Sequence, residues 1–307
     1  MNQTKIVAIS CVALLVVSLV FGFVAGLPDG NLHVVFCSVG QGDAMYIRMP
    51  DGRDAVIDGG PNGRVLACLG SQMAFWDREI DLMVLTHPHE DHFTGLIEIL
   101  KRYRVKNIVA PPVGNSDSDS YTEFVKLARA EGATIKNLYQ GEKIEFALQN
   151  TKLGNKNKVV FNSLWPTKQW VADSSSTVLT ESVLAVKTSY NDLNDFSQIL
   201  KMSYGAFDVL FTGDAESSIL EQIKSLIPQD SIEIIKVPHQ GNKHAMTEEL
   251  VSYIKPKLGV IMVGKNSYGH PSPYTIQILS NIGAFVRRTD KDGTVEIVSD
   301  GTTWRIR

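Results

Sequence analysis

Three of the seven histidines of this 307-residue chain lie within six residues of one another. The run Thr86-His87-Pro88-His89-Glu90-Asp91-His92 follows an apolar stretch and precedes an amphipathic one, so we expect it on a turn between a strand and a helix. Neutral imidazoles and a carboxylate together suit Zn, Mn or Fe. A solvated histidine-rich turn is the alternative, but buried ligands would be costly without a cation. The run therefore predicts a metal site formed by His87, His89, Asp91 and His92.

Glycine-rich motifs with polar side chains recur between the apolar runs. They are Val39–Ala44, Ile57–Gly60, Phe211–Glu216, Val237–Gly241 and Tyr268–Pro273. The first contains Gly40-Gln41-Gly42-Asp43, which reads either as a phosphate-binding turn or as a tight turn that needs glycine. On the first reading, Gln41 and Asp43 contact the substrate.

A second candidate substrate contact lies in the last of these motifs. His270 and Ser272 precede a predicted helix with Pro273 in its first turn, and Ser272 is the predicted N-cap. Free N–H groups at a helix start attract anions. We therefore predict that Ser272 contacts a phosphate and that His270 contacts it or acts as a general acid, with a simple capping turn as the alternative.

Short β-branched runs alternate with amphipathic stretches from residue 32 onward. The predicted strands are Leu32–Cys37, Ala44–Arg48, Ala55–Asp58, Leu82–Leu85, Lys106–Val109, Val159–Leu164, Ile199–Ser203, Val209–Phe211, Ile232–Val237, Gly259–Val263, Ala284–Arg288 and Val295–Ser299. The predicted helices are Phe93–Arg102, Tyr121–Ala130, Ala215–Ile227, Thr247–Ile254 and Pro273–Ile282. Asn150–Lys158 and Asp173–Thr180 are predicted surface loops. This order favours an α/β fold in which sheets pack face to face with helices outside.

The amino end carries an uncharged, apolar stretch from Ile6 to Val24, preceded by Lys5. Its length lies in the overlap between a cleavable signal peptide and a membrane-spanning helix, and both would export the rest of the chain. We therefore divide the chain into residues 1–26, a signal peptide or membrane anchor, and residues 31–307, one catalytic domain. We expect the protein outside the cytoplasm, either secreted or anchored to the cell membrane.

Composition and charge exclude several classes of protein. The chain is 44% hydrophobic and 21% charged with a formal charge of −3, so it is neither disordered nor strongly basic. Lys236 to Arg307 nevertheless carries ten basic against six acidic residues, which predicts that an anionic substrate prefers this part. Cys37 and Cys68 are interpreted as buried free thiols in preference to a disulfide.

These motifs together resemble the metallo-β-lactamase-fold hydrolases, whose HxHxDH signature matches His87, His89, Asp91 and His92. The five glycine-containing motifs, in their order, look like the soluble hydrolase domain of the ComEC/Rec2 DNA-uptake proteins. The resemblance covers nearly all of the chain after the apolar stretch, and we do not expect one apolar stretch to form the polytopic channel of those proteins. It implies a four-layer αβ/βα sandwich with one or two divalent metal ions, Zn or Mn, at one edge of the paired sheets.

The resemblance also implies individual roles. His87 and His89 would bind one metal, Asp91 and His92 the other, Asp214 would bridge them, and His239 would complete the second site. As ligands of the metal ions that would activate the water, Asp91 and Asp214 are predicted catalytic residues. Asp58, which follows an apolar run and precedes two glycines, would fix a ligand histidine.

The chain departs from the related pattern at two places. Asn194-Asp195-Phe196-Ser197 stands where many such enzymes have a third histidine for the first metal. That metal is therefore expected to bind weakly, or to be held through Asp195, Asn194 or water. Asn194 and Ser197 are also candidate substrate contacts. Gln240 replaces a second histidine, and His244 is considered as its substitute. Gln240 can donate hydrogen bonds but cannot carry a proton.

The predicted function is an exported metal-dependent hydrolase of phosphodiesters, acting on nucleic acid or another phosphodiester polymer through a metal-activated water. One alternative is a non-catalytic nucleic-acid- or metal-binding component of a surface DNA-uptake system. Another is a lactam or lactone hydrolase.

Overall fold

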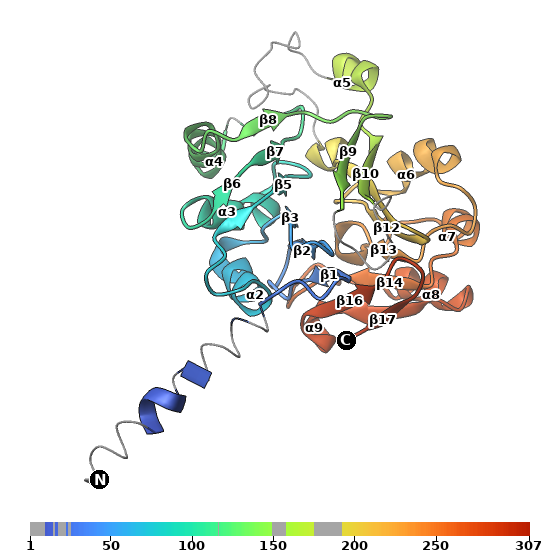
Figure 1. Ribbon diagram of the computed structural model, residues 1–307. Coiled ribbons are helices and arrows are strands. Elements are labelled where there is room, and N and C mark those ends of the chain that lie inside the picture. The colour runs from blue at the N-terminus through green and yellow to red at the C-terminus, as the bar shows by residue number, and fades with distance from the viewer. Residues whose placement is uncertain are drawn as a thin grey trace, which may run out of the picture.

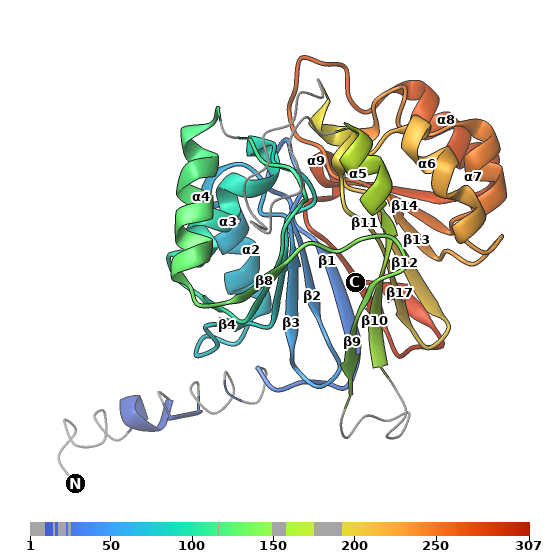
Figure 2. The same ribbon diagram turned by 90° about the horizontal axis from the view of Figure 1, so that it is seen from above.

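In the computed structural model, two sheets pack face to face and helices cover their outer faces (Figures 1 and 2). The structure describes residues 10–14, 16–17, 23, 26–115, 117–148, 158–174 and 192–307. The predicted four-layer αβ/βα architecture is thereby confirmed. Within the described residues, no helix is long and apolar enough to cross a membrane.

The first sheet has eight strands in the order β17-β16-β1-β2-β3-β5-β7-β8. Their bounds are β1 Leu32–Phe36, β2 Met45–Arg48, β3 Asp54–Ile57, β5 Leu82–Val84, β7 Asn107–Val109, β8 Thr134–Lys136, β16 Val295–Ser299 and β17 Trp304–Ile306. Strands β17 to β3 pair antiparallel, and β3, β5, β7 and β8 run parallel. A separate two-stranded sheet joins β4 Glu79–Ile80 and β6 Arg104–Val105.

The second sheet has seven strands in the order β15-β14-β13-β12-β11-β10-β9. Their bounds are β9 Lys143–Ala147, β10 Lys158–Trp165, β11 Ile199–Tyr204, β12 Phe207–Phe211, β13 Ile234–Lys236, β14 Leu258–Ile261 and β15 Phe285–Arg288. Strands β12 to β15 run parallel. Each sheet therefore has a parallel half, and the carboxyl ends of these strands carry the polar motifs.

Helices divide between the two outer faces (Figure 2). Beside the first sheet lie α2 Val65–Gln72, α3 Glu90–Leu100 and α4 Asp119–Ala130, and beside the second lie α6 Ser217–Ile223, α7 Glu248–Ile254 and α8 Pro273–Asn281. The remaining helices are α5 Lys168–Ser174, α9 Thr289–Asp292 and the 3-10 turns η1 Asn62–Arg64, η2 Leu193–Phe196, η3 Lys224–Leu226 and η4 His239–Gly241.

Three large apolar cores hold the layers together, and Val113, Val171 and Phe196 form a fourth, smaller cluster. The central core is formed by side chains of both sheets, such as Phe36, Phe161 and Phe211. A second core lies between the first sheet and its helices, and a third between the other sheet and its helices. Because strands in the middle of each sheet contact apolar side chains on both faces, they read as continuous apolar runs.

The predicted strands and helices are all present, with small shifts at their ends. The most informative shift concerns the helix predicted from Phe93, which begins at Glu90, so that Asp91 and His92 lie in its first turn. Helix α5 occupies the start of the predicted loop 173–180, while residues 175–180 and 150–157 of the two predicted loops lie outside the described residues.

One prediction about the cysteines is wrong. Cys37 and Cys68 form a disulfide that joins the end of β1 to α2, across 31 residues. Both cysteines belong to the same apolar core, so the buried environment that suggested free thiols also brings the two sulfur atoms together.

Candidate metal centre

The candidate site forms where the carboxyl ends of β3, β5, β12 and β13 meet. Asp58 follows β3, the histidine run follows β5, Asp214 follows β12, and His239 follows β13. A hydrogen bond from the N–H of Gln198 to the carbonyl of Thr86 (2.9 Å) ties the segment before β11 to this edge. Residues from both sheets thereby reach one point.

The three histidines of the run face one another. Nε2 of His87 lies 3.1 Å from Nδ1 of His89, and the rings of His87 and His92 have centroids 4.1 Å apart. His87 and His92 are fully buried. Burial, together with the neighbouring His92, holds the pKa of His87 well below its usual value. His87 is therefore neutral and offers a lone pair, as a metal ligand must.

Asp58 orients His92. Its carboxylate accepts hydrogen bonds from the N–H of Thr86 (2.8 Å), the hydroxyl of Thr86 (2.7 Å) and Nδ1 of His92 (2.8 Å). The contact between Asp58 and a histidine of the run is thus present as predicted. It turns Nε2 of His92 toward Oδ2 of Asp214, 3.3 Å away. Burial lowers the pKa of His92, but the carboxylates of Asp214, Asp91 and Asp58 outweigh it and raise that pKa well above its usual value.

Asp214 lies at the centre of the site and is 2% exposed. Burial disfavours its charge, but His92 and Lys236 outweigh burial and hold the pKa of Asp214 well below its usual value. Its N–H donates to the hydroxyl of Ser197 (3.1 Å). Because Ser197 is fully buried, its observed contact is with the backbone of Asp214, whereas the sequence suggested a contact with substrate.

A buried lysine, which the sequence analysis did not single out, lies beneath Asp214. Nζ of Lys236 donates to the carbonyl of Gly213 (2.7 Å) and to Oδ1 of Asp214 (3.2 Å), and it forms an ion pair with Asp43. Burial lowers the pKa of Lys236, but the carboxylates of Asp43 and Asp214 more than compensate and raise it. Lys236 is therefore charged.

This pair changes the interpretation of the Gly40-Gln41-Gly42-Asp43 motif. Asp43 is fully buried against Lys236, so it does not reach substrate. Gly42 has φ +123°, and a Cβ there would collide with the carbonyl of Asp91. The N–H of Asp43 also donates to that carbonyl (3.3 Å). The motif is a tight turn that packs under the histidine run, which is the second of the two predicted readings.

His239 is held by a carboxylate in the same way as His92. Nδ1 of His239 lies 2.8 Å from Oε1 of Glu216, which Asn242 also contacts. Burial lowers the pKa of His239, but its hydrogen bond with Glu216 and the Asp214 charge raise it overall. The Glu216 contact leaves Nε2 of His239 as the nitrogen available to a ligand. The sequence placed Glu216 inside a motif but gave it no role.

Gln240 reaches into the centre from a strained turn. His239 and Gln240 have φ of 46° and 47°, a left-handed conformation that costs free energy for residues other than glycine. Nε2 of Gln240 donates to Oδ2 of Asp214 (3.2 Å) and to Oδ2 of Asp91 (3.4 Å). Its Oε1 accepts from Gln41 (3.3 Å). His244 is exposed, and its backbone N–H donates to Oδ1 of Asn242.

A pocket of about 400 Å³ opens over this centre. It is lined by Gln41, Glu90, Asp91, His239, Gln240, Tyr268 and His270. Burial and the neighbouring His239 lower the pKa of His270, so His270 faces the pocket as a neutral imidazole. The hydroxyl of Ser272 accepts from the N–H of Tyr274 (3.3 Å), which confirms Ser272 as the N-cap of α8.

The residues present fit a divalent cation. One nitrogen or oxygen atom from each of His87, His92 and Asp214 lies within 4.8 Å of the others. Oδ1 of Asn194 is buried and has no hydrogen-bond partner among the described residues, which agrees with a ligand position that a third histidine would otherwise take. Imidazole, carboxylate and amide oxygen ligands together suit Zn or Mn.

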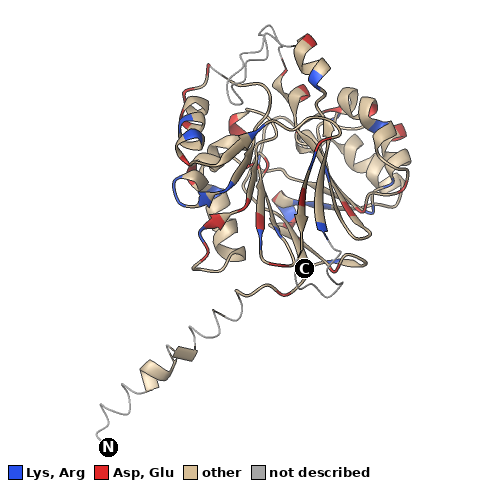
Figure 3. Cartoon of the chain, turned by 45° about the horizontal axis from the view of Figure 1, so that its top comes forward, with Lys and Arg blue, Asp and Glu red and all other residues tan. Residues whose placement is uncertain are grey.

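Charge is mixed over the surface, and Figure 3 shows basic and acidic residues interspersed over the molecule. Many of the cations after residue 235 are engaged: Lys236 is buried with Asp43, Lys257 pairs with Glu233, and Arg288 pairs with Asp290. The predicted excess of positive charge therefore does not act as one basic face. Lys243 and Lys265, which adjoin the pocket-lining segments, are exposed.

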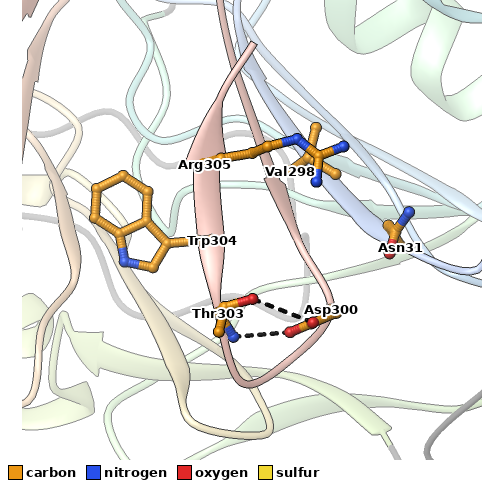
Figure 4. A pocket seen from close by; sticks show the side chains of 6 residues that line it. All are labelled: Asn31, Val298, Asp300, Thr303, Trp304 and Arg305. Atoms are coloured by element: carbon orange, nitrogen blue, oxygen red, sulfur yellow. Dashed lines mark hydrogen bonds between the residues drawn. The ribbon is translucent and has the colours of Figure 1, made fainter.

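A second cavity, of about 140 Å³, lies beside β16 and β17 (Figure 4). It is lined by Asn31, Val298, Asp300, Thr303, Trp304 and Arg305. The carboxylate of Asp300 accepts from the N–H groups of Thr302 and Thr303, so it stabilises the turn that joins the two strands. Among the described residues, the groups of side chains that could hold a metal ion include none that lines this cavity.

Comparison with known proteins agrees with this geometry. A model of the metallo-beta-lactamase superfamily matches residues 37–153. The chain is 24% identical over 295 residues to ComE operon protein 3 of Bacillus subtilis, covering 87% of this chain and 33% of that protein. It is 24% identical over 269 residues to Recombination protein 2 of Haemophilus influenzae, covering 84% of this chain and 28% of that protein. The chain thus spans about a third or less of the length of either relative.

Solved structures show the same fold. The metallo-beta-lactamase fold protein YhfI of Bacillus subtilis matches with a TM-score of 0.52 and 10% identity, over 86% of this chain and 99% of that one. Zn²⁺-bound PqqB of Methylobacterium extorquens matches with a TM-score of 0.51 and 12% identity, over 83% and 97% of the two chains. The resemblance inferred from the motifs is confirmed, and the superfamily match supports a metal-dependent hydrolase.

Proposed function

We propose that this chain, whose fold is that of the metallo-β-lactamases, is an exported hydrolase of phosphodiester bonds, with nucleic acid or another phosphodiester polymer as its substrate. The observation that carries the proposal is the convergence of neutral His87, oriented His92 and ionised Asp214. Gln240, which donates to Asp214, and Asp91 line the adjoining open pocket. The name of one relative, a recombination protein, agrees with a nucleic-acid substrate.

The residues divide into two groups for metal binding. His87 and His89, with Asn194, would hold one divalent ion, Zn or Mn, and Asp91, His92 and His239 would hold another, with Asp214 between them. Such ions, when bound, lower the pKa of a water molecule and neutralise charge on a phosphoryl group. The hydrogen bonds that Asp58 accepts from His92 and that Glu216 accepts from His239 fix the ligand nitrogens in advance.

Other pocket residues would act on the substrate. His270 and Gln41 line the pocket, so they are placed to hydrogen-bond a phosphate oxygen. Because His270 is neutral, it would serve as a hydrogen-bonding group in preference to a charged acid. Gln240 would orient the carboxylates of Asp91 and Asp214 through its amide and carries no proton itself.

Two observations support export. The apolar stretch of residues 6–24 is the segment that the sequence marks as a signal or a membrane tether. The chain also contains the Cys37–Cys68 disulfide, and disulfides form and persist in oxidising compartments. We therefore place the domain outside the cytoplasm.

One observation favours a second candidate function. Gln240 stands where related domains have a second histidine, and its amide contacts both Asp91 and Asp214. Because this amide cannot carry a proton, the substitution would suit a nucleic-acid-binding component without activity. A lactam or lactone hydrolase would use the same ligands, and no particular contact favours it.

The test is cleavage of single-stranded DNA, duplex DNA and bis(4-nitrophenyl) phosphate by the full chain in detergent, with Mn, with Zn or with a chelator. Asp214→Ala is the inactive control. Cleavage that requires metal and disappears in Asp214→Ala supports a phosphodiesterase. If metal-loaded protein binds DNA but cleaves none of these substrates, the binding function takes its place, and hydrolysis of a chromogenic lactam would favour the third function.

A further inference from the structure

An exposed aromatic ring stands at the rim of the pocket. Tyr268 is 75% exposed, although it lines the pocket together with His270. It belongs to the segment Gly264–Pro271, here called the rim loop, which connects the end of β14 to α8. Other exposed aromatics, such as Phe285 and Tyr274, do not line this pocket.

The rim loop is fixed by one side chain at its centre. Oδ1 of Asn266 accepts from the N–H groups of Tyr268 (3.1 Å) and His270 (3.0 Å). Its Nδ2 donates to the carbonyls of Gly264 and His270, both at 2.9 Å. Gly269 has φ +80°, which lets the chain turn between the two rings. The backbone thus positions the Tyr268 ring in solvent, without packing against the apolar core.

A series of rings leads from the loop to the metal centre. The centroids of Tyr268 and His270 are 5.8 Å apart with planes 35° from parallel, and those of His270 and His239 are also 5.8 Å apart. The His270 ring therefore lies between Tyr268 and a group bound at His239. Lys265, exposed in the same loop, adds a positive charge that suits a phosphate backbone.

We propose that Tyr268 is a stacking platform for the nucleobase next to the phosphate held at the metal centre. An aromatic ring stacks on any base without regard to sequence, while nearby cations contact the backbone. The base must be unstacked from its own strand to reach the ring, so the platform selects single strands over duplex. This inference rests on the proposed function and names the class of polymer that the pocket takes.

The experiment compares two oligomers with the same backbone, a short oligothymidylate and an oligomer of abasic tetrahydrofuran units. Binding to the full chain in detergent is measured by fluorescence anisotropy with Mn, at times before cleavage is detectable, and cleavage is then followed under the same conditions. The variants are Tyr268→Ala, Tyr268→Phe, which keeps the ring, and Tyr274→Ala, which removes an exposed tyrosine outside the pocket.

We expect wild type to prefer the thymidine oligomer. Tyr268→Ala should raise the Kd and KM for the thymidine oligomer about tenfold and leave the Kd and KM for the abasic oligomer unchanged. Tyr268→Phe and Tyr274→Ala should behave like wild type. Equal binding of both oligomers by wild type, or equal losses for both in Tyr268→Ala, would overturn the platform. Base-dependent binding that is lost in Tyr268→Ala without any cleavage would keep the platform and refute the hydrolase.

Discussion

The ammonium group of Lys236 and the carboxylate of Asp43 form an ion pair that is sealed from solvent beneath the candidate metal centre. The same ammonium group contacts Oδ1 of Asp214 at 3.2 Å, so Asp214 presents Oδ2 toward His92. Three carboxylates, those of Asp43, Asp58 and Asp214, are buried in this cluster. The positive charge of Lys236 offsets part of their negative charge. It also fixes which oxygen of Asp214 faces the site.

The first prediction is that Lys236→Met destabilises the fold. Removing the ammonium group leaves the carboxylates of Asp43 and Asp214 buried without their positively charged partner. This loss should lower the free energy of unfolding by about 3–5 kcal/mol. Urea unfolding in chelator measures this loss without a contribution from metal. The double variant Lys236→Met with Asp43→Asn should recover part of it, since one unpaired charge is removed. A single variant within about 1 kcal/mol of wild type would contradict the proposed charge balance.

The sequence was informative about the fold where apolar periodicity was strong. Interior strands such as β1 and β14 are buried along their whole length, and their ends were predicted to within two residues. Two of the edge strands that were missed are β8, which reads Thr-Ile-Lys, and β9, which reads Lys-Ile-Glu-Phe-Ala with one buried residue. Edge strands carry charges because these oppose pairing with other chains, and the same charges weaken the signal of a strand.

The site was predictable where residue type alone indicates chemistry. Histidines and aspartates at close spacing identified the run from His87 to His92, and a carboxylate after a strand identified Asp58. Lys236 was missed because a lysine in an apolar strand has no local feature that shows its partner, which lies 193 positions away at Asp43. The Cys37–Cys68 bond was missed for the same reason, since only tertiary packing shows that two buried cysteines meet.

The second prediction concerns Glu216, which orients His239. Glu216→Gln should weaken the binding of the Zn or Mn ion assigned to Asp91, His92 and His239 by about 10- to 100-fold, because the neutral amide oxygen is a weaker acceptor than the carboxylate for Nδ1 of His239 and fixes the ring less firmly. Competition with a chromogenic chelator measures the affinity directly. Glu248→Gln, an exposed change in the first turn of α7, is the matched control. Equal metal affinities for the two variants would show that the 2.8 Å contact does not support binding.

The third prediction is a pH dependence of stability that arises from Asp54, which is not one of the candidate metal ligands. Burial raises the pKa of Asp54 to about 8, while the hydrogen bond from Tyr46 (2.6 Å) lowers it only in part. Between pH 4 and 8 the folded state therefore holds a proton that the unfolded chain has released, so this residue makes stability fall as pH rises. Asp54→Asn stays neutral at every pH.

Urea unfolding at pH 5 and pH 8.5 checks this sign. The stability of Asp54→Asn relative to wild type should increase by more than about 1 kcal/mol from the lower to the higher pH. Asp230→Asn, a change at an exposed position, should show no such trend. A constant difference between Asp54→Asn and wild type would mean that Asp54 is ionised throughout this range.

The fourth prediction tests the disulfide and, with it, the exported state. Cys37 and Cys68 close a loop across 31 residues, so reduction should lower the free energy of unfolding by about 3–4 kcal/mol through the larger entropy of the open chain. Thiol titration of the unfolded full chain should find one free thiol, that of Cys11, without reductant and three with it. Cys11→Ser is the control and should keep the response of the unfolding midpoint to reductant. Three free thiols in protein purified from its native compartment would remove the disulfide as support for export, because an oxidising environment is what would have formed the bond.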